Sequence, residues 1–344
     1  HYPLRRQRQM CIRDRNKIPS LIHFEQYRID FNQVILKAIK KIENGDVDED
    51  ILKIKYILID EYQDFSELFF RLISSIRNRN PNVNFFCVGD DWQAINRFAG
   101  SDVEYFYKYS SYFENAISKE ISINYRSSEE IIAKSNKFMC DSGFYGSLAK
   151  AFKKGTGSNL DIKDIDDVYI ELREGNELYQ RDEIYIEQFI SNHGIKDSEY
   201  QVKARYLKKC IEIIRENPNK KILILHRNNY FKYIELEHFL NKLFKVLVKL
   251  QIIKSEKECK EIITIKTMHS AKGLESDVVI LLEINQGVIP MFHPDTELFK
   301  IFGEDIESNL DDQRRLFYVA MTRAKEKLYI LTEKEKRSDF LQLL

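Results

Sequence analysis

The sequence has 344 residues, and its 54 Lys and Arg residues balance 54 Asp and Glu residues, so net charge indicates neither nucleic-acid binding nor its absence. The length predicts two domains, and 43% hydrophobic with 31% charged residues is typical of a globular chain. The five cysteines form no C-x-x-C pair, which argues against a zinc site or a disulfide framework and favours a reducing cytoplasm. No apolar run approaches the roughly 18 residues that a membrane span needs.

The first residues differ from the rest of the chain. Residues 4–15 are dense in arginine and have no apolar period, a pattern that also fits a basic arm for nucleic acid. Residues 10–15 look like a translated sequencing adapter. Residues 1–15 are therefore predicted to be a leader foreign to the natural protein, which would then be truncated at its N-terminus.

A short apolar run at residues 56–59 ends in Asp60 and Glu61. Such a run predicts a strand buried on both faces, as in a parallel sheet. Carboxylates at the carboxyl end of that strand lie where open α/β sheets bind ligands. One can hold Mg²⁺, usually through water, and the other can orient or deprotonate an attacking water. The pair also fits an acidic strand-to-loop edge without chemistry.

The same pattern follows a second strand. Residues 84–88 form another apolar run, and Asp90, Asp91 and Gln93 come directly after it. Two neighbouring strands that both end in polar side chains predict one nucleotide site. Apolar residues at helical spacing predict helices over 24–42 and 66–76.

The remainder predicts a second α/β domain. Residues 121–123 predict a short strand, and Ser127 or Ser128 can cap a helix over 129–138. The Gly-, Ser- and Lys-rich stretch 141–159 predicts a linker, with the domain boundary between Tyr125 and Asn159. Strands are expected at 168–172, 221–225, 262–266, 278–282 and 328–331, and helices at 200–216, 231–250 and 311–325. This alternation predicts a largely parallel sheet.

Five blocks together resemble the superfamily 1 DNA helicases of the UvrD/Rep type, and most closely the helicase IV branch. The blocks are IDEYQD at 59–64, VGDDWQAI at 88–95, NYRSS at 124–128, TMHSAKGLE at 267–275 and RRLFYVAMTRA at 314–324. The resemblance covers roughly residues 21–344. It implies two RecA-like α/β domains with mainly parallel sheets, which clamp ATP and move 3′ to 5′ along single-stranded DNA. Residues 16–140 would be the Walker B side of the first, incomplete domain. Residues 141–344 would be the second, with little or no accessory insertion.

The resemblance assigns the chemistry of ATP hydrolysis to four residues near the first two strands. It implies that Asp60 holds Mg²⁺ through water and that Glu61 activates the water that attacks the γ-phosphate. Gln63 and Gln93 resemble residues that sense the γ-phosphate. An amide suits this task because it both donates and accepts hydrogen bonds.

Further ATP contacts follow from the three later blocks. Tyr125 resembles a residue that stacks on adenine, although the position also fits a core tyrosine. Arg126 and Arg323 resemble arginines that reach the γ-phosphate, where a planar guanidinium matches phosphate geometry. Gly273 and Glu275 are expected in the same nucleotide site, with Glu275 near the ribose or the sensor arginines.

The resemblance also implies a DNA-binding group. Phe98 is expected to stack on a base and Asn96 to lie beside it, while Thr267, His269 and Lys272 belong to a block that touches the DNA backbone in the family. Phe98 also fits a buried core position, and His269 also fits a residue that only orders its loop.

Several features depart from the family pattern. The sequence contains no phosphate loop ending in Gly-Lys-Thr, and GTGS at 155–158 lacks the Lys and follows no buried strand. Asn96 stands where many members have an aromatic residue, and Ser276 replaces a usual Phe. The chain as given is therefore expected to be inactive alone.

Three functional interpretations remain. The first is an ATP-dependent, cytoplasmic DNA helicase or translocase for DNA repair, acting on single-stranded DNA and on junctions of single- and double-stranded DNA. The second is a non-hydrolysing nucleic-acid-binding regulator, against which the joint presence of Glu61, Gln93, Arg126 and Arg323 argues. The third is the motor part of a helicase–nuclease.

Overall fold

The computed structural model describes residues 30–47, 49–144, 146, 148–153, 159–165, 197–231, 234–291 and 306–344. The chain forms two compact units. The first contains the residues up to Asp60 together with Phe65–Val88, and the second contains Glu61–Asp64 together with Gly89–Leu344. This division lies earlier in the chain than the boundary expected between Tyr125 and Asn159. Residues 89–140 group with the second unit because their apolar side chains pack there. Phe138, for example, contacts Phe317 edge-on at 5.2 Å between ring centroids.

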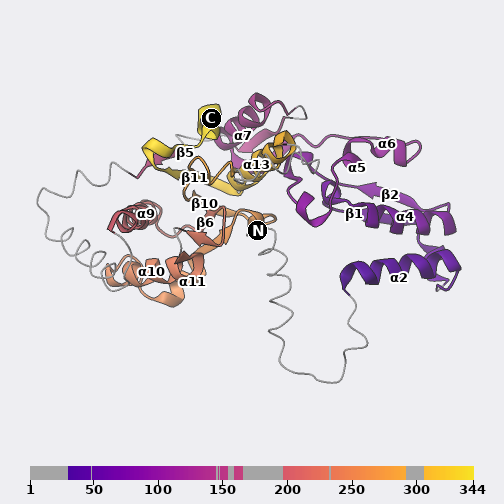
Figure 1. The fold of residues 1–344 in the computed structure, drawn as a ribbon, viewed down its shortest axis with the longest axis horizontal. Helices are drawn as coiled ribbons and strands as arrows, with labels where there is room; N and C mark the ends of the chain where they lie inside the picture. Colours follow the sequence, from indigo (N-terminus) through magenta and orange to yellow (C-terminus); the bar gives the residue numbers. More distant parts are fainter. Residues whose placement is uncertain are drawn as a thin grey trace, which may run out of the picture. The chain divides into compact units, whose positions relative to one another are not determined.

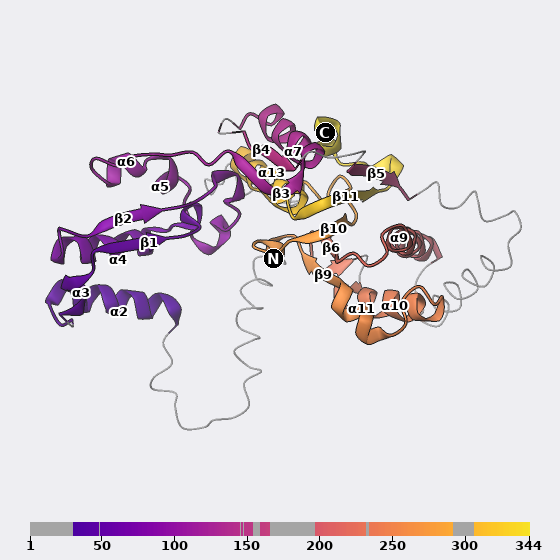
Figure 2. The ribbon, with the colours of Figure 1, turned by 180° about the vertical axis from the view of Figure 1, so that it is seen from behind.

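The first unit is a two-stranded parallel sheet with helices. Its elements are α2 (Phe31–Asn44), α3 (Asp50–Lys53), β1 (Tyr56–Ile59), α4 (Glu67–Arg79) and β2 (Asn84–Cys87). β1 pairs with β2 in parallel, with Tyr56 opposite Asn84. α2 packs against α4, and Figures 1 and 2 show the two helices side by side. Ile35, Ile39 and Ile42 of α2 are buried, at the spacing of one helix face.

One face of this small sheet is exposed. Leu58 is 74% exposed and Phe86 is 62% exposed, whereas Ile57 and Ile59 are half-buried. Successive side chains of a strand point to opposite faces, so the exposed residues share one face. The prediction that residues 56–59 are buried on both faces is therefore wrong. In the part of the chain that the structure describes, β2 is the one strand that pairs with β1.

The second unit contains a five-stranded sheet in the order β5-β11-β10-β6-β9. Its strands are β5 (Leu160–Asp164), β6 (Ile222–His226), β9 (Ile263–Thr267), β10 (Ser276–Leu281) and β11 (Ala324–Thr332). All neighbouring pairs are parallel. The predicted parallel α/β architecture is confirmed.

Helices cover both faces of this sheet. They are α7 (Glu129–Asp141) and α13 (Ile306–Met321) on one face, and α9 (Asp197–Glu216), α10 (Leu236–Lys249) and α11 (Glu256–Ile262) on the other. Leu223 and Val279 belong to the apolar core beneath α7 and α13. Their neighbours Ile224 and Ile280 belong to the opposite core with α9 and α10. The inner strands β6 and β10 are buried almost throughout because each of their faces contributes to a core.

The remaining elements are short. They are η1 (Tyr62–Asp64), η2 (Asp91–Gln93), η3 (Arg97–Ala99), α5 (Glu104–Tyr107), α6 (Tyr109–Tyr112), β3 (Ile123–Ser128), β4 (Lys150–Lys153), β7 (Tyr230–Phe231), β8 (Ile234–Glu235), η6 (His269–Ala271), η7 (Lys334–Lys336) and η8 (Asp339–Leu343). Among them, η1, η2, β3 and η6 carry motif residues. β3 pairs with β4 in parallel, with an irregularity between Asn124 and Ser128.

Several predicted boundaries are wrong. The strand expected at 121–123 is β3, which starts at Ile123 and includes the whole NYRSS block, and the stretch expected as a linker contains β4. The helix expected over 231–250 starts at Leu236, after β7 and β8. α13 ends at Met321, so Arg323 lies in the turn before β11 and not within a helix. The strand expected at 168–172 and residues 24–29 of the first helix lie outside the described residues.

No described helix combines the length and the apolar character needed to cross a membrane.

Candidate functional site

The first carboxylates follow β1 directly. Asp60 belongs to the first unit, and the next residue, Glu61, belongs to the second unit. Glu61 has a φ of 51°, in the left-handed region that residues other than glycine rarely adopt. Such backbone strain is concentrated at functional sites. Gln63 of η1 is only 1% exposed, and its Nε2 donates to Oε2 of Glu61 at 2.5 Å.

Hydrogen bonds extend from Gln63 to the second motif. The backbone N–H of Asp90 donates to Oε1 of Gln63 at 2.9 Å. Nε2 of Gln93 donates to the Asp90 carboxylate at 2.6 Å. Burial raises the pKa of Asp90, while the hydrogen bond from Gln93 lowers it. The two glutamines are thus tied to one another through Asp90.

Arg323 completes this chain of contacts. Its Nη2 donates to Oε1 of Gln93 at 3.2 Å, its Nε to the carbonyl of Val319 at 2.8 Å and its Nη1 to the carbonyl of Leu274 at 3.3 Å. Only 1% of Arg323 is exposed. Burial lowers its pKa to about 10, so the guanidinium still carries its charge at neutral pH. We call the path from Glu61 through Gln63, Asp90 and Gln93 to Arg323 the glutamine relay.

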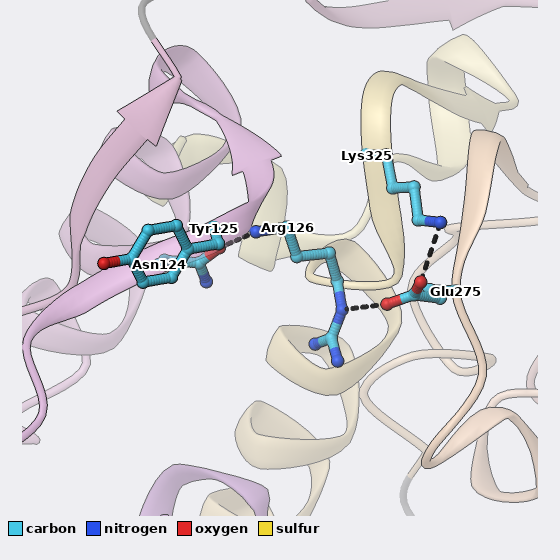
Figure 3. Close-up of a pocket in the computed structure, with 5 residues that line it drawn as sticks. All are labelled: Asn124, Tyr125, Arg126, Glu275 and Lys325. Atoms are coloured by element: carbon cyan, nitrogen blue, oxygen red, sulfur yellow. Dashed lines mark hydrogen bonds and ion pairs between the residues drawn. The ribbon is translucent and has the colours of Figure 1, made fainter.

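A separate open pocket of about 510 Å³ lies in the second unit. It is lined by Asn124, Tyr125, Arg126, Glu275 and Lys325. Figure 3 shows Arg126 pointing to one carboxylate oxygen of Glu275 and Lys325 to the other, at 2.8 and 2.7 Å. Hydrogen bonds from Lys325 and Arg126 lower the pKa of Glu275 to about 2, so this carboxylate is ionised at neutral pH.

The side chains of Asn124 and Ser127 fix the backbone of β3 around Arg126. Oδ1 of Asn124 accepts the N–H groups of Arg126 and Ser127, at 2.8 and 3.0 Å. The hydroxyl of Ser127 donates to the Ala324 carbonyl at 2.6 Å, which ties β3 to β11. Tyr125 is 61% exposed, so the alternative of a core tyrosine is wrong. Its ring lies 4.7 Å from that of Phe152.

A second group of side chains surrounds Phe98. Phe98 is 68% exposed, which rules out the core alternative. Its ring meets His269 edge-on, with 5.7 Å between centroids. Nδ1 of His269 lies 3.4 Å from Nη1 of Arg227, whose Nε donates to Gln313 at 3.2 Å. Burial, with a smaller effect of the Arg227 charge, lowers the pKa of His269 to about 4, so the imidazole is neutral at neutral pH.

Arg227 was not predicted as a site residue from the sequence because it lies outside the five motif blocks. It directly follows β6, at the carboxyl end of a buried parallel strand. Asp60 and Asp90 were recognised by that same position, so the signal was present.

The remaining predicted DNA residues lie elsewhere or have local partners. Thr267 bonds the hydroxyl and the backbone N–H of Ser270, and thereby orders the loop around η6. Asn96 donates to Asp64 at 2.7 Å, and Lys272 donates to the same carboxylate at 2.6 Å. The structure therefore brings Asn96 and Lys272 to Asp64, not to Phe98 and His269.

Gly273 follows Lys272 and has a φ of 82°. Only glycine adopts this conformation without strain, and nothing lies within 4 Å of the position a Cβ would take. The glycine thus serves the backbone turn between the loop and β10.

The carboxylate of Asp60 fits a Mg²⁺ ion that is bound together with a nucleotide. The described residues contain no group of three or more His, Cys, Asp or Glu side chains that could hold a metal ion. Mg²⁺ in nucleotide sites usually takes one or two carboxylates and completes its shell with phosphates and water. Asp60, at the carboxyl end of β1, is a carboxylate of this kind.

The parallel α/β sheets, with carboxylates, glutamines and arginines gathered near strand ends, define a RecA-like fold of the kind that binds nucleotides. Comparison of the sequence is more specific. The chain belongs to the UvrD-like helicase C-terminal domain family, which it matches over residues 20–335. The resemblance to UvrD/Rep-type helicases is thereby confirmed.

Named relatives agree with this family. DNA helicase IV of Escherichia coli (strain K12) is 27% identical over 319 residues, which cover 92% of this chain and 39% of that protein. A probable DNA helicase of Mycoplasma pneumoniae (strain ATCC 29342 / M129 / Subtype 1) is 26% identical, over 81% of this chain and 44% of that protein. ATP-dependent DNA helicase Rep of Buchnera aphidicola subsp. Schizaphis graminum (strain Sg) is 27% identical, over 62% of this chain and 28% of that protein. The chain spans less than half the length of these relatives.

Proposed function

We propose that this chain is motor machinery of an ATP-dependent DNA helicase or translocase that moves 3′ to 5′ along single-stranded DNA in the cytoplasm. The observation that carries the proposal is the glutamine relay, which connects Glu61 to Arg323 by successive hydrogen bonds. A relay of this kind lets a change at a bound phosphate reach residues far apart in the sequence. The names of the relatives, all DNA helicases, support the nucleic-acid substrate.

The proposed chemistry assigns one task to each group. Glu61 orients the attacking water and accepts its proton, while Gln63 fixes the carboxylate. Arg126 and Arg323 stabilise charge on the transferred phosphoryl group. Mg²⁺, held by Asp60, would neutralise charge on the phosphates when it is bound.

The proposed nucleotide contacts use the open pocket. Tyr125 offers an exposed ring for the adenine, and its contact with Phe152 steadies that ring. Glu275 holds Arg126 until a phosphate competes for the guanidinium. Junctions of single- and double-stranded DNA are the expected working substrate.

The proposed DNA contacts centre on Phe98. An exposed aromatic face stacks on a base, a contact worth about 1–3 kcal/mol. His269 supports the ring from its edge, and Arg227 supplies the positive charge for a neighbouring phosphate.

The test of hydrolysis is Glu61→Gln in a protein that joins this chain to a phosphate-binding loop. DNA-stimulated ATP hydrolysis is expected to fall by about 10²–10⁴, since a general base is lost, with nucleotide affinity changed only a few-fold. Glu114→Gln, at an exposed position, is the matched control. Turnover of Glu61→Gln within a few-fold of wild type would remove Glu61 as the base.

ATP binding without turnover in the wild type would favour a non-hydrolysing regulator. Unwinding of duplexes with 3′ or 5′ tails reports the direction.

The 344-residue chain itself is expected to hydrolyse almost no ATP. Its sequence has no Gly-Lys-Thr loop whose backbone N–H groups and Lys could hold the β- and γ-phosphates in line with Glu61. The measurement is an ATPase assay of residues 16–344 with and without single-stranded DNA. Turnover that disappears in Glu61→Gln would show that another segment replaces the loop.

A further inference from the structure

The ammonium group of Lys272 is held by three oxygens of the second unit. Nζ lies 2.6 Å from Oδ2 of Asp64, 2.9 Å from the carbonyl oxygen of Gln93 and 3.3 Å from Oε2 of Glu61. The side chain is only 13% exposed. An ammonium has three donors, and these three oxygens match that number. In this arrangement Lys272 faces the ATP-hydrolysis residues and not a DNA phosphate.

The contact with Glu61 affects the oxygen that the proposed chemistry needs. Oε2 of Glu61 accepts the hydrogen bond from Gln63 and also faces the Lys272 ammonium. The ammonium attracts this carboxylate and so restrains its position. Lys272 also holds Gln93 by its carbonyl, so one ammonium restrains two members of the glutamine relay.

Lys272 is joined to His269, which contacts Phe98, by a very short segment. It directly follows η6, and its backbone N–H donates to the His269 carbonyl at 3.4 Å. His269 carries the edge-on contact with Phe98. Gly273, on the other side of Lys272, has no heavy atom within 4 Å of the position a Cβ would take, and glycine adopts a wider range of dihedral angles than other residues. A shift of η6 therefore moves the base of the Lys272 side chain.

We propose that Lys272 is a positioning residue that restrains Glu61 and Gln93, and that single-stranded DNA at Phe98 and His269 withdraws this restraint through η6. The proposal rests on the proposed function, because it explains how DNA stimulates hydrolysis. It gives Lys272 a role in coupling in place of a contact with the DNA backbone.

Substitution of Lys272 by Met is expected to preserve the fold. Asp64 keeps its hydrogen bond from Asn96 at 2.7 Å, and Glu61 keeps the one from Gln63. Each carboxylate then keeps one hydrogen-bond donor, which limits the cost of removing the cation. Methionine also fills most of the space of the lysine stem.

The first experiment measures hydrogen exchange at residues 62–64, where the Asp64 N–H donates to the Glu61 carbonyl. It compares wild type and Lys272→Met in the full chain, with and without oligothymidylate. Without DNA, the variant should exchange about fivefold faster at these amides, the factor for one net hydrogen bond. Oligothymidylate should accelerate their exchange in the wild type and leave the variant unchanged. Lys266→Met, at an exposed lysine of β9, should behave as wild type.

Two results would overturn the proposal. One is unchanged exchange at residues 62–64 in Lys272→Met without DNA. The other is oligothymidylate that binds the wild type yet leaves these amides unchanged. Failure of the wild type to bind oligothymidylate at all would instead contradict the proposed DNA function, and the variant without DNA would still decide whether Lys272 restrains Glu61.

The second experiment is an ATPase assay in a protein that joins this chain to a phosphate-binding loop. Lys272→Met should raise the DNA-independent kcat and lower the ratio of DNA-stimulated to basal rate, with little change in KM for ATP. Lys272→Arg, which keeps the charge, should restore much of the ratio. A kcat that falls equally with and without DNA would contradict the restraint and make Lys272 directly necessary for turnover.

Discussion

At the scale of single residues, His269 has the clearest pH dependence. Burial and the charge of Arg227 lower its pKa from 6.5 to about 4 in the folded chain. Between these values the unfolded chain binds a proton that the folded chain does not. The contribution of His269 to the free energy of unfolding is therefore fully present above pH 6.5. It decreases as the pH falls towards about 4, by up to about 3 kcal/mol.

Urea unfolding followed by circular dichroism over this pH range measures the effect. His269→Gln should lose the part of the pH dependence that belongs to this histidine. The matched control is His238→Gln, because His238 is exposed on α10 and should leave the pH dependence as in the wild type. If the unfolding free energies of wild type and His269→Gln changed with pH in parallel, the pH dependence would not come from His269.

Ser127 is a second residue with a defined energetic role. Its buried hydroxyl donates to the Ala324 carbonyl, so Ser127→Ala leaves that carbonyl without this donor. We expect a loss of about 1–3 kcal/mol in unfolding free energy and weaker nucleotide binding, because Arg126 lies next in the chain. Ser118→Ala, at an exposed position, is the control. Equal stability of the two variants in urea would show that β3 is fixed to β11 by other contacts.

At the scale of elements, the strand pair β1–β2 presents an exposed apolar face through which copies of the chain are expected to associate. Leu58 and Phe86 are mostly exposed, although parallel sheets are normally covered on both faces. Leu58→Lys should therefore reduce aggregation of the chain, measured by light scattering, without loss of helical circular dichroism. Ile73→Lys, which places a charge at a buried position of α4, should instead unfold the first unit. Unchanged scattering of Leu58→Lys would mean that this face does not drive association.

The elements that could be predicted from the sequence are those with strong hydrophobic patterns. β6 and β10 contain continuous apolar runs, β9 alternates buried with exposed residues, and α10 shows a clear helical period. β3 was not predictable at its full length, because INYRSS is polar and its conformation depends on pairing with β4 and on the Ser127 bond. The early end of α13 was missed for a similar reason. The Arg323 side chain is fixed by carbonyls that are distant in sequence or one turn back.

The candidate site was predictable only in its composition. The motif blocks identified Glu61, Gln93 and Arg323, and the resemblance supplied their roles, which stay predictions. Lys272 was grouped with His269 because both lie in one block. Yet His269 begins η6 and Lys272 follows its end, and the two side chains contact different partners. Spacing in the sequence does not encode such a divergence, because it depends on where Asp64 lies.

At the scale of the whole molecule, the two units should differ in stability. The sheet of the second unit has five strands and an apolar core on each face, whereas that of the first has two strands and one exposed face. Amides of β1 and β2 should therefore exchange with solvent well before those of β6 and β10. Mass-resolved hydrogen exchange tests this order. A single common exchange rate for both sheets would mean that the chain unfolds as one cooperative body.

Trp92 is the one tryptophan of the sequence, and it lies inside η2 between Asp91 and Gln93. It is 4% exposed and meets the Tyr318 ring edge-on, with 5.3 Å between centroids. The molecule thus contains its own optical label, next in sequence to Gln93 of the glutamine relay. Its emission should lie at short wavelength in the resting chain and shift when Gln93 or Tyr318 moves. In a protein that joins this chain to a phosphate-binding loop, time-resolved fluorescence can then follow the events of a single turnover without any added dye.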